Sequence, residues 1–409
     1  MNFTDQDLLN LIHEPESNWL ERKQSFLKEK DKKTKEQISK TICAFANALA
    51  EADRAGVILI GIDDSGVPVG VPDTDEVRKG VDELRSDGLI QPLPSLVVRS
   101  IRHNAQIHLI AIIVQASSLP PVRFRGQIYV RMSASVREGN AEDERILNER
   151  RRHKSGRSFD SEGIPTAELT DLNLRYFEEA YLPSIIARDV LRANGRSIEE
   201  KLVTTRMAMN ASSSCTPTVA GLLALGHTPQ DWFAGAYVQF VRYAGTSQGG
   251  EILDQVRISG NLETVIRLTE EKIKAQIKVA VNISNQDLEI QLSDYPLAAL
   301  QQLFRNAVLH RSYEGTNAPI RVYWFDDRIE MANPGGPFGA VTIENFGRPY
   351  ATDYRNPVLA EVLHGLSFVQ KFGFGIQNAK QQLSANGNPE PKFDVSSSMV
   401  VVTIQKRFP

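Results

Sequence analysis

The chain has 409 residues, which is enough for two or three domains with cores of their own. Its formal net charge of −3 excludes a uniformly basic surface, so nucleic acid would have to bind to a local patch of positive charge. The two cysteines, Cys43 and Cys215, are far apart, which excludes a disulfide framework and indicates buried thiols. The start of the chain does not resemble a secretory signal, and apolar runs such as 109–114 are shorter than the roughly 20 residues that span a bilayer. We therefore expect a cytoplasmic protein.

The first of three predicted units comprises residues 1–157 and has an α+β pattern. Thr4 is a suitable N-cap for a short helix that ends before Pro15. A second helix is predicted over residues 35–52 by an apolar stripe at helical spacing: Ile38, Ile42, Phe45 and Leu49. Apolar runs bounded by turn residues predict strands at 57–62, 96–101, 107–115 and 128–132.

Acidic residues in this unit come from two separate segments. Glu16 and Glu21 lie shortly before Lys23, and Asp63 and Asp64 directly follow the apolar strand at 57–62. A cluster of carboxylates repels itself unless a cation intervenes, so these residues are candidate ligands for Mg²⁺ or Mn²⁺. The alternative is that the glutamates are ordinary solvated residues and that the aspartates begin a hairpin turn.

Basic residues collect at both ends of the same unit. The candidates for phosphate contact are Lys28, Lys30, Lys32, Lys33, Arg123, Arg125, Arg131, Arg151 and Arg152. A solvated loop and an amphipathic helix would explain each stretch equally well. Acidic and basic residues together fit an RNA backbone bound over a cutting centre better than either group alone.

The second predicted unit comprises residues 158–283 and contains no pattern typical of catalysis. We expect mainly helices here, with a pair of strands at 218–225 and 236–243. Its expected roles are packing and oligomerisation.

The third predicted unit, residues 284–409, contains a helix over 297–310. Gln302, Asn306 and His310 are four residues apart and share one face of that helix. The core face carries Leu300, Leu303, Phe304 and Ala307. Gly335, Gly336, Gly373 and Gly375 would allow close approach of the backbone to phosphates. Tight turns would explain the same glycines.

The first unit resembles the Schlafen AlbA-2 domain. The resemblance rests on E-x4-E-R-K from Glu16, C-A-F-A-N from Cys43 and G-I-D-D-S-G-V from Gly61. It implies a metal-binding triad of Glu16, Glu21 and Asp64, with Asp63 as the alternative third carboxylate and Lys23 at the position of the family's lysine. Arg22 departs from the family's aromatic residue, and the segment after Asn47 is longer than the family's usual turn.

That resemblance implies cleavage of structured RNA such as tRNA, and a role in antiviral defence against phages. Other bacterial members are described only as DNA-binding transcriptional regulators. Vertebrate Schlafen cores surround RNA with two related lobes, and this chain has one such lobe, so we expect a homo-oligomer, a dimer or larger.

The third unit resembles a divergent GHKL-type ATP-binding module of the kind often labelled RecG-like. Its signature is the helix 297–310, the run N-P-G-G from Asn333, and G-F-G from Gly373. The chain has no G-x4-G-K-[ST] loop and therefore no helicase motor signature. Gln302 stands where active members have a glutamate that activates water, and Asn333 stands where an aspartate reads adenine. We therefore expect a regulatory or a purely structural nucleotide fold, one that hydrolyses ATP poorly or not at all.

These observations predict an α+β protein with a mainly helical middle segment and a C-terminal GHKL-like α/β sandwich. The leading hypothesis is a metal-dependent endoribonuclease. The alternatives are a non-catalytic DNA- or RNA-binding regulator with an ATP-sensing module, and a GHKL-type ATPase with a docking domain.

Overall fold

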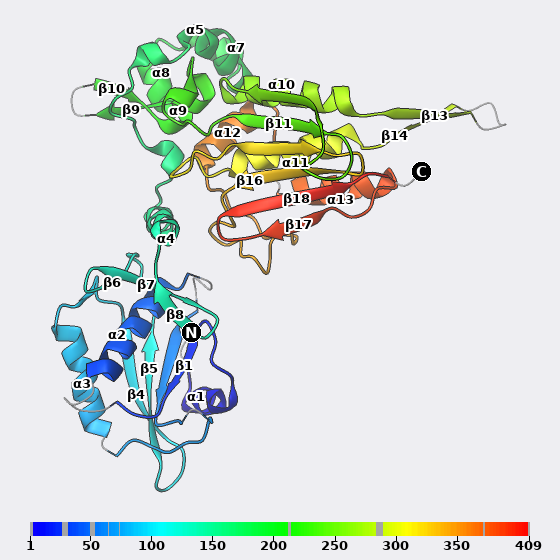
Figure 1. The fold of residues 1–409 in the computed structure, drawn as a ribbon. Coiled ribbons are helices and arrows are strands. Elements are labelled where there is room, and N and C mark those ends of the chain that lie inside the picture. The colour runs from blue at the N-terminus through cyan, green and yellow to red at the C-terminus, as the bar shows by residue number, and fades with distance from the viewer. Residues whose placement is uncertain are drawn as a thin grey trace. The chain divides into compact units, whose positions relative to one another are not determined.

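The structure is a computed structural model that describes residues 3–26, 32–49, 54–63, 65–72, 74–211, 214–283, 289–370 and 373–407. It divides the chain into two compact units, Met1–Gly156 and Arg157–Pro409 (Figure 1). The predicted boundary at residue 157 coincides with this division. The predicted boundary at residue 283 falls inside the second unit, because strands from both sides of it share one sheet.

The first unit is built on a sheet in which β1 and β2 are parallel and the other neighbours are antiparallel. Its order is β1 (Leu20–Lys23), β2 (Gly56–Ile60), β5 (His108–Val114) and β4 (Leu96–Arg102). A smaller sheet has the order β3 (Ile90–Gln91), β6 (Arg123–Phe124), β7 (Gln127–Met132) and β8 (Ser135–Glu138). The strands predicted at 57–62, 96–101, 107–115 and 128–132 are confirmed as β2, β4, β5 and β7.

Helices cover both faces of the larger sheet in the first unit. Their bounds are α1 (Asp5–Asn10), α2 (Lys32–Asn47) and α3 (Thr74–Ser86). A further helix, α4 (Ala141–Lys154), packs through Leu147 against Ile128 and Val130 of β7 in the smaller sheet. Apolar residues of α2 and α3 pack against Ile58 and Ile60 on one face, and α1 packs near Val57 and Leu59 on the other. Successive residues of a strand point to opposite faces, so the wholly apolar β2 fills both cores.

Asn47, the last residue of α2, joins that helix to the smaller sheet. Its Oδ1 accepts a hydrogen bond from the Val122 N–H (2.7 Å), and its Nδ2 donates to the carbonyls of Val122 (3.0 Å) and Tyr129 (2.8 Å). The side chain is buried. The asparagine of the C-A-F-A-N run therefore stabilises the fold and is not part of an exposed site.

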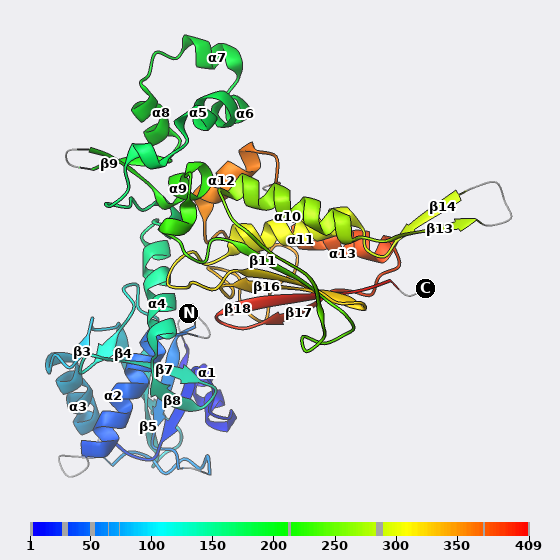
Figure 2. The same ribbon diagram turned by 45° about the horizontal axis from the view of Figure 1, so that its top comes forward.

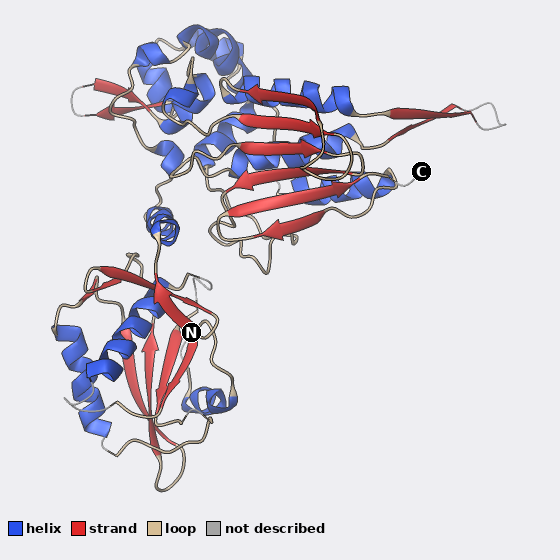
Figure 3. Cartoon of the chain, in the orientation of Figure 1, coloured by secondary structure: helices blue, strands red, loops and turns tan. Residues whose placement is uncertain are grey.

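The second unit contains a larger, mixed sheet that lies against a layer of helices (Figure 3). Its order is β12 (Ile252–Ile258), β11 (Val238–Tyr243), β15 (Ile320–Trp324), β16 (Arg328–Pro334), β18 (Met399–Gln405) and β17 (Lys392–Val395). β11 and β15 are parallel, with Val238 opposite Ile320. The predicted middle and C-terminal segments thus share one hydrophobic core.

The longer helices of this unit pack on one face of that sheet. Their bounds are α10 (Leu262–Gln276), α11 (Leu297–His310), α12 (Pro357–Gly365) and α13 (Gly375–Ala385). Shorter helices precede them: α5 (Leu174–Tyr176), η4 (Phe177–Tyr181), α6 (Leu182–Ile185), α7 (Arg188–Ala193), α8 (Ile198–Thr204) and α9 (Val219–Leu225). Two hairpins complete the unit: β9 (Ala208–Ala211) with β10 (Ser214–Pro217), and β13 (Val279–Ile283) with β14 (Glu289–Ser293). The hairpin of β13 and β14 follows α10 and precedes α11 in the chain, and it extends beyond the sheet (Figure 2).

The predicted strand at 218–225 is wrong, because residues Val219–Leu225 form the helix α9. Thr218 caps this helix by accepting a hydrogen bond from the Gly221 N–H. All seven helical residues are buried. A short apolar run that is buried on every side has no amphipathic period, so its sequence does not distinguish a helix from a strand. The strand predicted at 236–243 and the helix at 297–310 are confirmed as β11 and α11, and so is the mixed α+β architecture.

Candidate functional site

The ends of β1 and β2 lie at the same edge of the first unit's sheet. Because these strands are parallel, Lys23 at the end of β1 pairs with Ile60 at the end of β2. The Lys23 carbonyl then accepts a hydrogen bond from Gly61 (2.8 Å), whose φ of +102° turns the chain towards Asp63. The fold therefore brings Glu21 and Lys23 to the edge at which the aspartate pair begins.

Two cations of the protein itself neutralise Glu21. One carboxylate oxygen lies 2.5 Å from Lys23 Nζ, and the other lies 2.5 Å from Arg131 Nη1. Glu21 is 6% exposed and Arg131 is 3% exposed. Arg131 also donates to the carbonyls of Ser17 (2.6 Å) and Leu20 (3.1 Å). The prediction that Arg131 contacts nucleic acid needs correction, since a guanidinium buried in this way holds β1 to β7 and does not reach a phosphate.

The other predicted acidic ligands have backbone partners. Glu16 Oε1 accepts a hydrogen bond from the Arg22 N–H (2.9 Å). Asp63 Oδ1 accepts from the N–H groups of Ser65 (2.9 Å) and Val67 (2.8 Å), as in an Asx-turn. Asp64 lies outside the described residues. Among the described residues, no group of three His, Cys, Asp or Glu side chains is placed to hold a metal ion.

The predicted basic residues that the structure describes lie on several elements of the first unit. Arg123 forms an ion pair with Glu144, and Arg125 forms one with Glu36 (3.4 Å). Arg151 is exposed on α4. Lys28 and Lys30 lie outside the described residues, as do the side chains of Lys32 and Lys33, and Arg152 is partly buried with a partner of its own.

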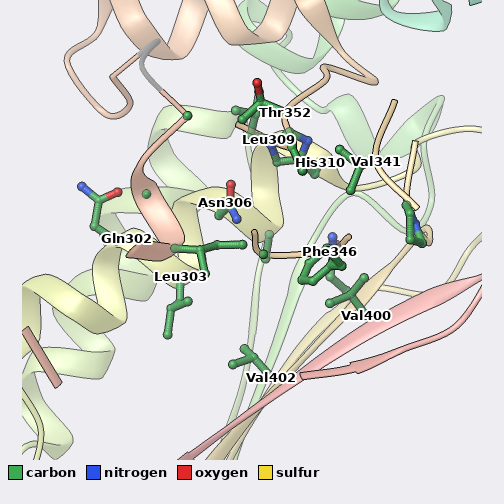
Figure 4. A pocket seen from close by; sticks show the side chains of 18 of the residues that line it. Gln302, Leu303, Asn306, Leu309, His310, Val341, Phe346, Thr352, Val400 and Val402 are labelled. Carbon is green, nitrogen blue, oxygen red and sulfur yellow. The ribbon is translucent and has the colours of Figure 1, made fainter. Parts of the chain in front are cut away.

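A pocket in the second unit brings together all eight residues predicted to bind a nucleotide (Figure 4). The cavity has a volume of about 170 Å³. Gln302, Asn306 and His310 line it from α11, and Asn333 lines it from β16. The glycines come from the loop after β16 and from the start of α13: Gly335, Gly336, Gly373 and Gly375. Segments up to about 70 residues apart thus meet around one cavity.

The floor of the pocket is apolar. Val400 and Val402 of β18 lie opposite Asn333 and Met331 of β16 and point to the helix-covered face. Phe346 and Val341 close one side, and Leu303 of α11 lies across from them (Figure 4). This slot suits a flat aromatic ring.

Asn333 is the buried polar group of that slot. Its side chain is 7% exposed, and its Oδ1 has no hydrogen-bond partner in the protein. A buried acceptor without a partner costs roughly 1–3 kcal/mol, which a ligand donor would recover.

His310 is kept uncharged at the other end of the slot. Burial and the neighbouring Arg355 guanidinium lower the pKa of His310 to about 4, although Asp353 opposes the shift. The ring stacks on Tyr354 with centroids 5.8 Å apart. Arg355 donates to the carbonyls of His310 (2.9 Å) and Gly336 (3.1 Å), so it holds the end of α11 to the glycine loop.

Close packing explains part of the glycine pattern. Gly335 has a φ of +107°, and a Cβ at Gly336 would lie 2.3 Å from the Ser396 carbonyl oxygen. Gly373 has a φ of +69°, and Gly375 begins α13 without a side-chain cap. Gly335 and Gly336 are therefore required by the tight turn, which is the alternative explanation that the sequence offered for these glycines. Gly373 and Gly375 leave the N-terminus of α13 open to the pocket.

Sequence reasoning missed several lining residues. Arg348 lines the pocket and is exposed, and it follows Gly347, whose carbonyl accepts from Gln377 of α13 (2.7 Å). Val400 and Val402 were also missed. Val400 and Val402 line the site because β18 pairs with β16, and a local sequence pattern does not predict the pairing of two strands so far apart in the chain.

Comparisons with known proteins support the two motif assignments. Residues 16–140 match the family model described as "Schlafen, AlbA_2", and residues 317–404 match "Putative ATP-dependent DNA helicase recG C-terminal". No curated protein matches the chain. Among the residues that the structure describes, no helix has both the length and the apolar character needed to cross a membrane.

Two solved structures are similar to parts of the chain. The DIP2311 protein from Corynebacterium diphtheriae has 20% sequence identity and a TM-score of 0.44, over 96% of this chain and 65% of that one. The chain therefore spans about two thirds of that protein's length. The N-terminal domain of an ATP-dependent DNA helicase RecG-related protein from Nitrosomonas europaea has 24% identity and a TM-score of 0.22, over 28% of this chain and 75% of that one.

The two family matches indicate a function related to nucleic acids. The chain therefore combines an N-terminal Schlafen AlbA-2 domain with a C-terminal domain of the RecG C-terminal, ATPase-like type, as its motifs predicted.

Proposed function

We propose that this protein is a nucleic-acid-binding regulator whose C-terminal domain binds a purine nucleotide, ATP in the first instance, and hydrolyses it slowly or not at all. The observation that carries the proposal is the convergence of all eight predicted nucleotide-contacting residues on one pocket. The nucleic acid binds to the Schlafen AlbA-2 domain, with RNA favoured and DNA as the alternative.

The lining of the pocket matches the parts of a nucleotide. The apolar slot between Val402 and Leu303 accepts the base, and the buried Asn333 oxygen accepts a hydrogen bond from it. The N-terminus of α13 carries free N–H groups and the positive end of the helix dipole, which favours a phosphate. Arg348 at the rim supplies a positive charge for the outer phosphates.

The same residues support binding without efficient turnover. Gln302 is an amide and cannot take a proton from water at neutral pH. His310 has a pKa of about 4 and is therefore a weak base. Mg²⁺ would arrive with the nucleotide, and the Asn306 and Gln302 side-chain oxygens are the groups on this face of α11 that would hold it.

Titration calorimetry of the full chain with ATP and Mg²⁺ tests this proposal. We expect saturable binding to the wild-type protein, and loss of about tenfold or more in affinity for Asn306→Ala. Asn317→Ala is the matched control, because this exposed asparagine lies outside the pocket. Phosphate release measured on the same samples should stay near background. Equal affinities for the three proteins would refute a nucleotide site at α11.

Gel-shift titrations with total tRNA and with duplex DNA test the nucleic-acid half of the proposal. We expect binding that weakens with salt, because phosphate contacts release counterions. Repeating the titrations with saturating ATP measures regulation, which appears as a change in apparent affinity. Light scattering on the same protein measures the mass, and we expect a dimer or larger homo-oligomer.

A metal-dependent endoribonuclease is the second candidate. The observation in its favour is the parallel pairing of β1 and β2, which brings Glu21, Lys23 and the start of the aspartate pair to one edge of the sheet. The described residues do not fit a metal site, however. Lys23 and Arg131 already neutralise Glu21, and a Mg²⁺ or Mn²⁺ ion would have to displace Lys23.

Incubation of total tRNA with the wild-type protein and with the Glu16→Ala/Glu21→Ala double variant separates the two candidates. Each protein is tested with Mn²⁺, with Mg²⁺ and with a chelator. Binding without cleavage supports the regulator. Cleavage that requires both the metal and the glutamates supports the nuclease. Glu21 is also part of a buried ion pair, so the melting temperature of the double variant is measured first and both proteins are assayed below it.

A further inference from the structure

One end of the apolar slot contains a neutral amide, the side chain of Asn333. Asn333 is the penultimate residue of β16, and Val400 of β18 lies directly opposite it. It is 7% exposed and faces the cavity together with Met331 and Val402. Its Oδ1 has no partner in the protein, so no hydrogen bond to that oxygen fixes the orientation of the amide.

Charged and titratable groups elsewhere in the lining of the cavity are held by the protein. Arg355 donates to the carbonyls of His310 and Gly336. Asp353 accepts hydrogen bonds from the N–H groups of Ala340 (3.0 Å) and Tyr354 (2.8 Å). His310 is neutral because its pKa is lowered to about 4. A base in the slot therefore meets the Asn333 amide as its main polar reader and encounters no free charge there.

An amide reads the edges of both purines. It offers one acceptor oxygen and an NH₂ donor. Towards adenine, Oδ1 accepts from the N6 amine while Nδ2 donates to the adjacent ring nitrogen. Towards guanine, the amide turns by 180°, so that Nδ2 donates to O6 and Oδ1 accepts from the N1–H. A carboxylate at the same place accepts only, and its charge repels O6.

We infer that this pocket is a general purine site that accepts guanine nucleotides as well as adenine nucleotides, with Asn333 as the residue that reads the base. The inference rests on the proposed nucleotide-binding function and names its ligand class. The apolar slot packs against the ring of either purine. The group at the 6-position of the ring forms a hydrogen bond with the Asn333 amide.

A series of nucleotides tests this inference on the wild-type full chain by titration calorimetry. ATP, GTP and ITP should bind within about fivefold of one another, because each presents a group at the 6-position that the amide can pair with. Purine riboside triphosphate, which lacks that group, should bind about tenfold more weakly. CTP, with its smaller ring, serves as the pyrimidine control.

The Asn333→Asp variant provides the second test. The carboxylate cannot donate to O6, so it should weaken ITP binding by about tenfold or more relative to ATP, while Asn317→Asp, an exposed change outside the pocket, leaves this ratio unchanged. GTP is left out of this ratio, because its N1–H and N2 amine both donate to a carboxylate. A wild-type preference for ATP of thirtyfold or more, or an unchanged ratio in a folded Asn333→Asp protein, overturns the inference and leaves ATP binding intact. Failure of every nucleotide to bind overturns the proposed function and this inference together.

Discussion

The buried ion pair between Arg131 and Glu21 leads to a quantitative prediction about the first unit. Replacing Arg131 by leucine removes the 2.5 Å contact to Glu21 and the donors to the carbonyls of Ser17 and Leu20. Breaking a buried pair by removing one partner typically costs about 3–5 kcal/mol, and because Glu21 keeps Lys23 as a partner we expect a loss near the lower end of that range. A typical domain has a free energy of unfolding of about 5–15 kcal/mol, so the substitution removes a large part of it.

Hydrogen exchange of the full chain in increasing urea measures this effect in the peptides that contain β1 and β7. We expect Arg131→Leu to lower the free energy of unfolding of the first unit by about 3 kcal/mol. The Arg131→Leu/Glu21→Leu double variant should be more stable than the single variant, because it no longer buries a carboxylate that has lost its buried partner. Arg151→Leu is the matched control, since Arg151 is exposed on α4, and should change the free energy by less than about 0.5 kcal/mol.

A loss below about 1 kcal/mol for Arg131→Leu would refute the reasoning, because a contact of that strength is typical of exposed ion pairs. A double variant less stable than the single one would show that Glu21 depends chiefly on Lys23. In the first case Glu21 would not be strongly held by Arg131, and the endoribonuclease candidate would gain support.

Three further predictions concern single side chains. Arg348→Ala should weaken ATP binding by about tenfold and leave adenosine binding unchanged, as measured by calorimetry, because the proposed role of Arg348 is contact with the outer phosphates and not with the base; equal losses for both ligands would contradict this role. His310→Phe should reduce the dependence of the free energy of unfolding on pH. In the folded protein the pKa of His310 is about 4, below the ordinary value of 6.5. As the pH falls from 6.5 to 4, the unfolded chain takes up a proton that the folded chain does not, so the free energy of unfolding of the wild-type protein decreases by at most about 3 kcal/mol. Melting curves at pH 7 and pH 4.5 should show a smaller drop for the variant, and an equal drop would contradict the assignment. Asn47→Leu should cost about 3 kcal/mol in hydrogen exchange of the first unit, because it leaves an N–H and two carbonyls buried without their partner; a cost below about 1 kcal/mol would mean that water replaces the amide.

Strands and helices with a strong local period were predictable from the sequence. The runs that became β2 and β5 are apolar and β-branched and are bounded by turn residues, and α11 has a clear core face. The helix α9 was not predictable in this way, because all of its residues are buried and its pattern has no polar face. The helix α3 (Thr74–Ser86) had no prediction at all, although Val77, Val81 and Leu84 are its buried stripe.

The sequence likewise predicted the residues of the candidate sites but not all of their interaction partners. The nucleotide-binding residues were named from motifs, and the structure brings all of them to one cavity. The acidic residues were also named from motifs, but their partners were not. Glu21 forms an ion pair with a residue 110 positions later in the chain, and a local pattern carries no information about which distant charge will be buried beside it.

The sequence by itself determined the domain types, the class of fold and eight of the residues that line the pocket, because short motifs and periodic patterns encode these locally. Tertiary structure alone decided that the middle segment shares a sheet with the C-terminal domain, that β18 supplies the pocket floor, and that Arg131 is a buried partner of Glu21 and not a surface cation. The physical reason is that strand pairing and charge burial depend on which distant surfaces meet when the cores form, and those contacts leave no periodic trace along the chain.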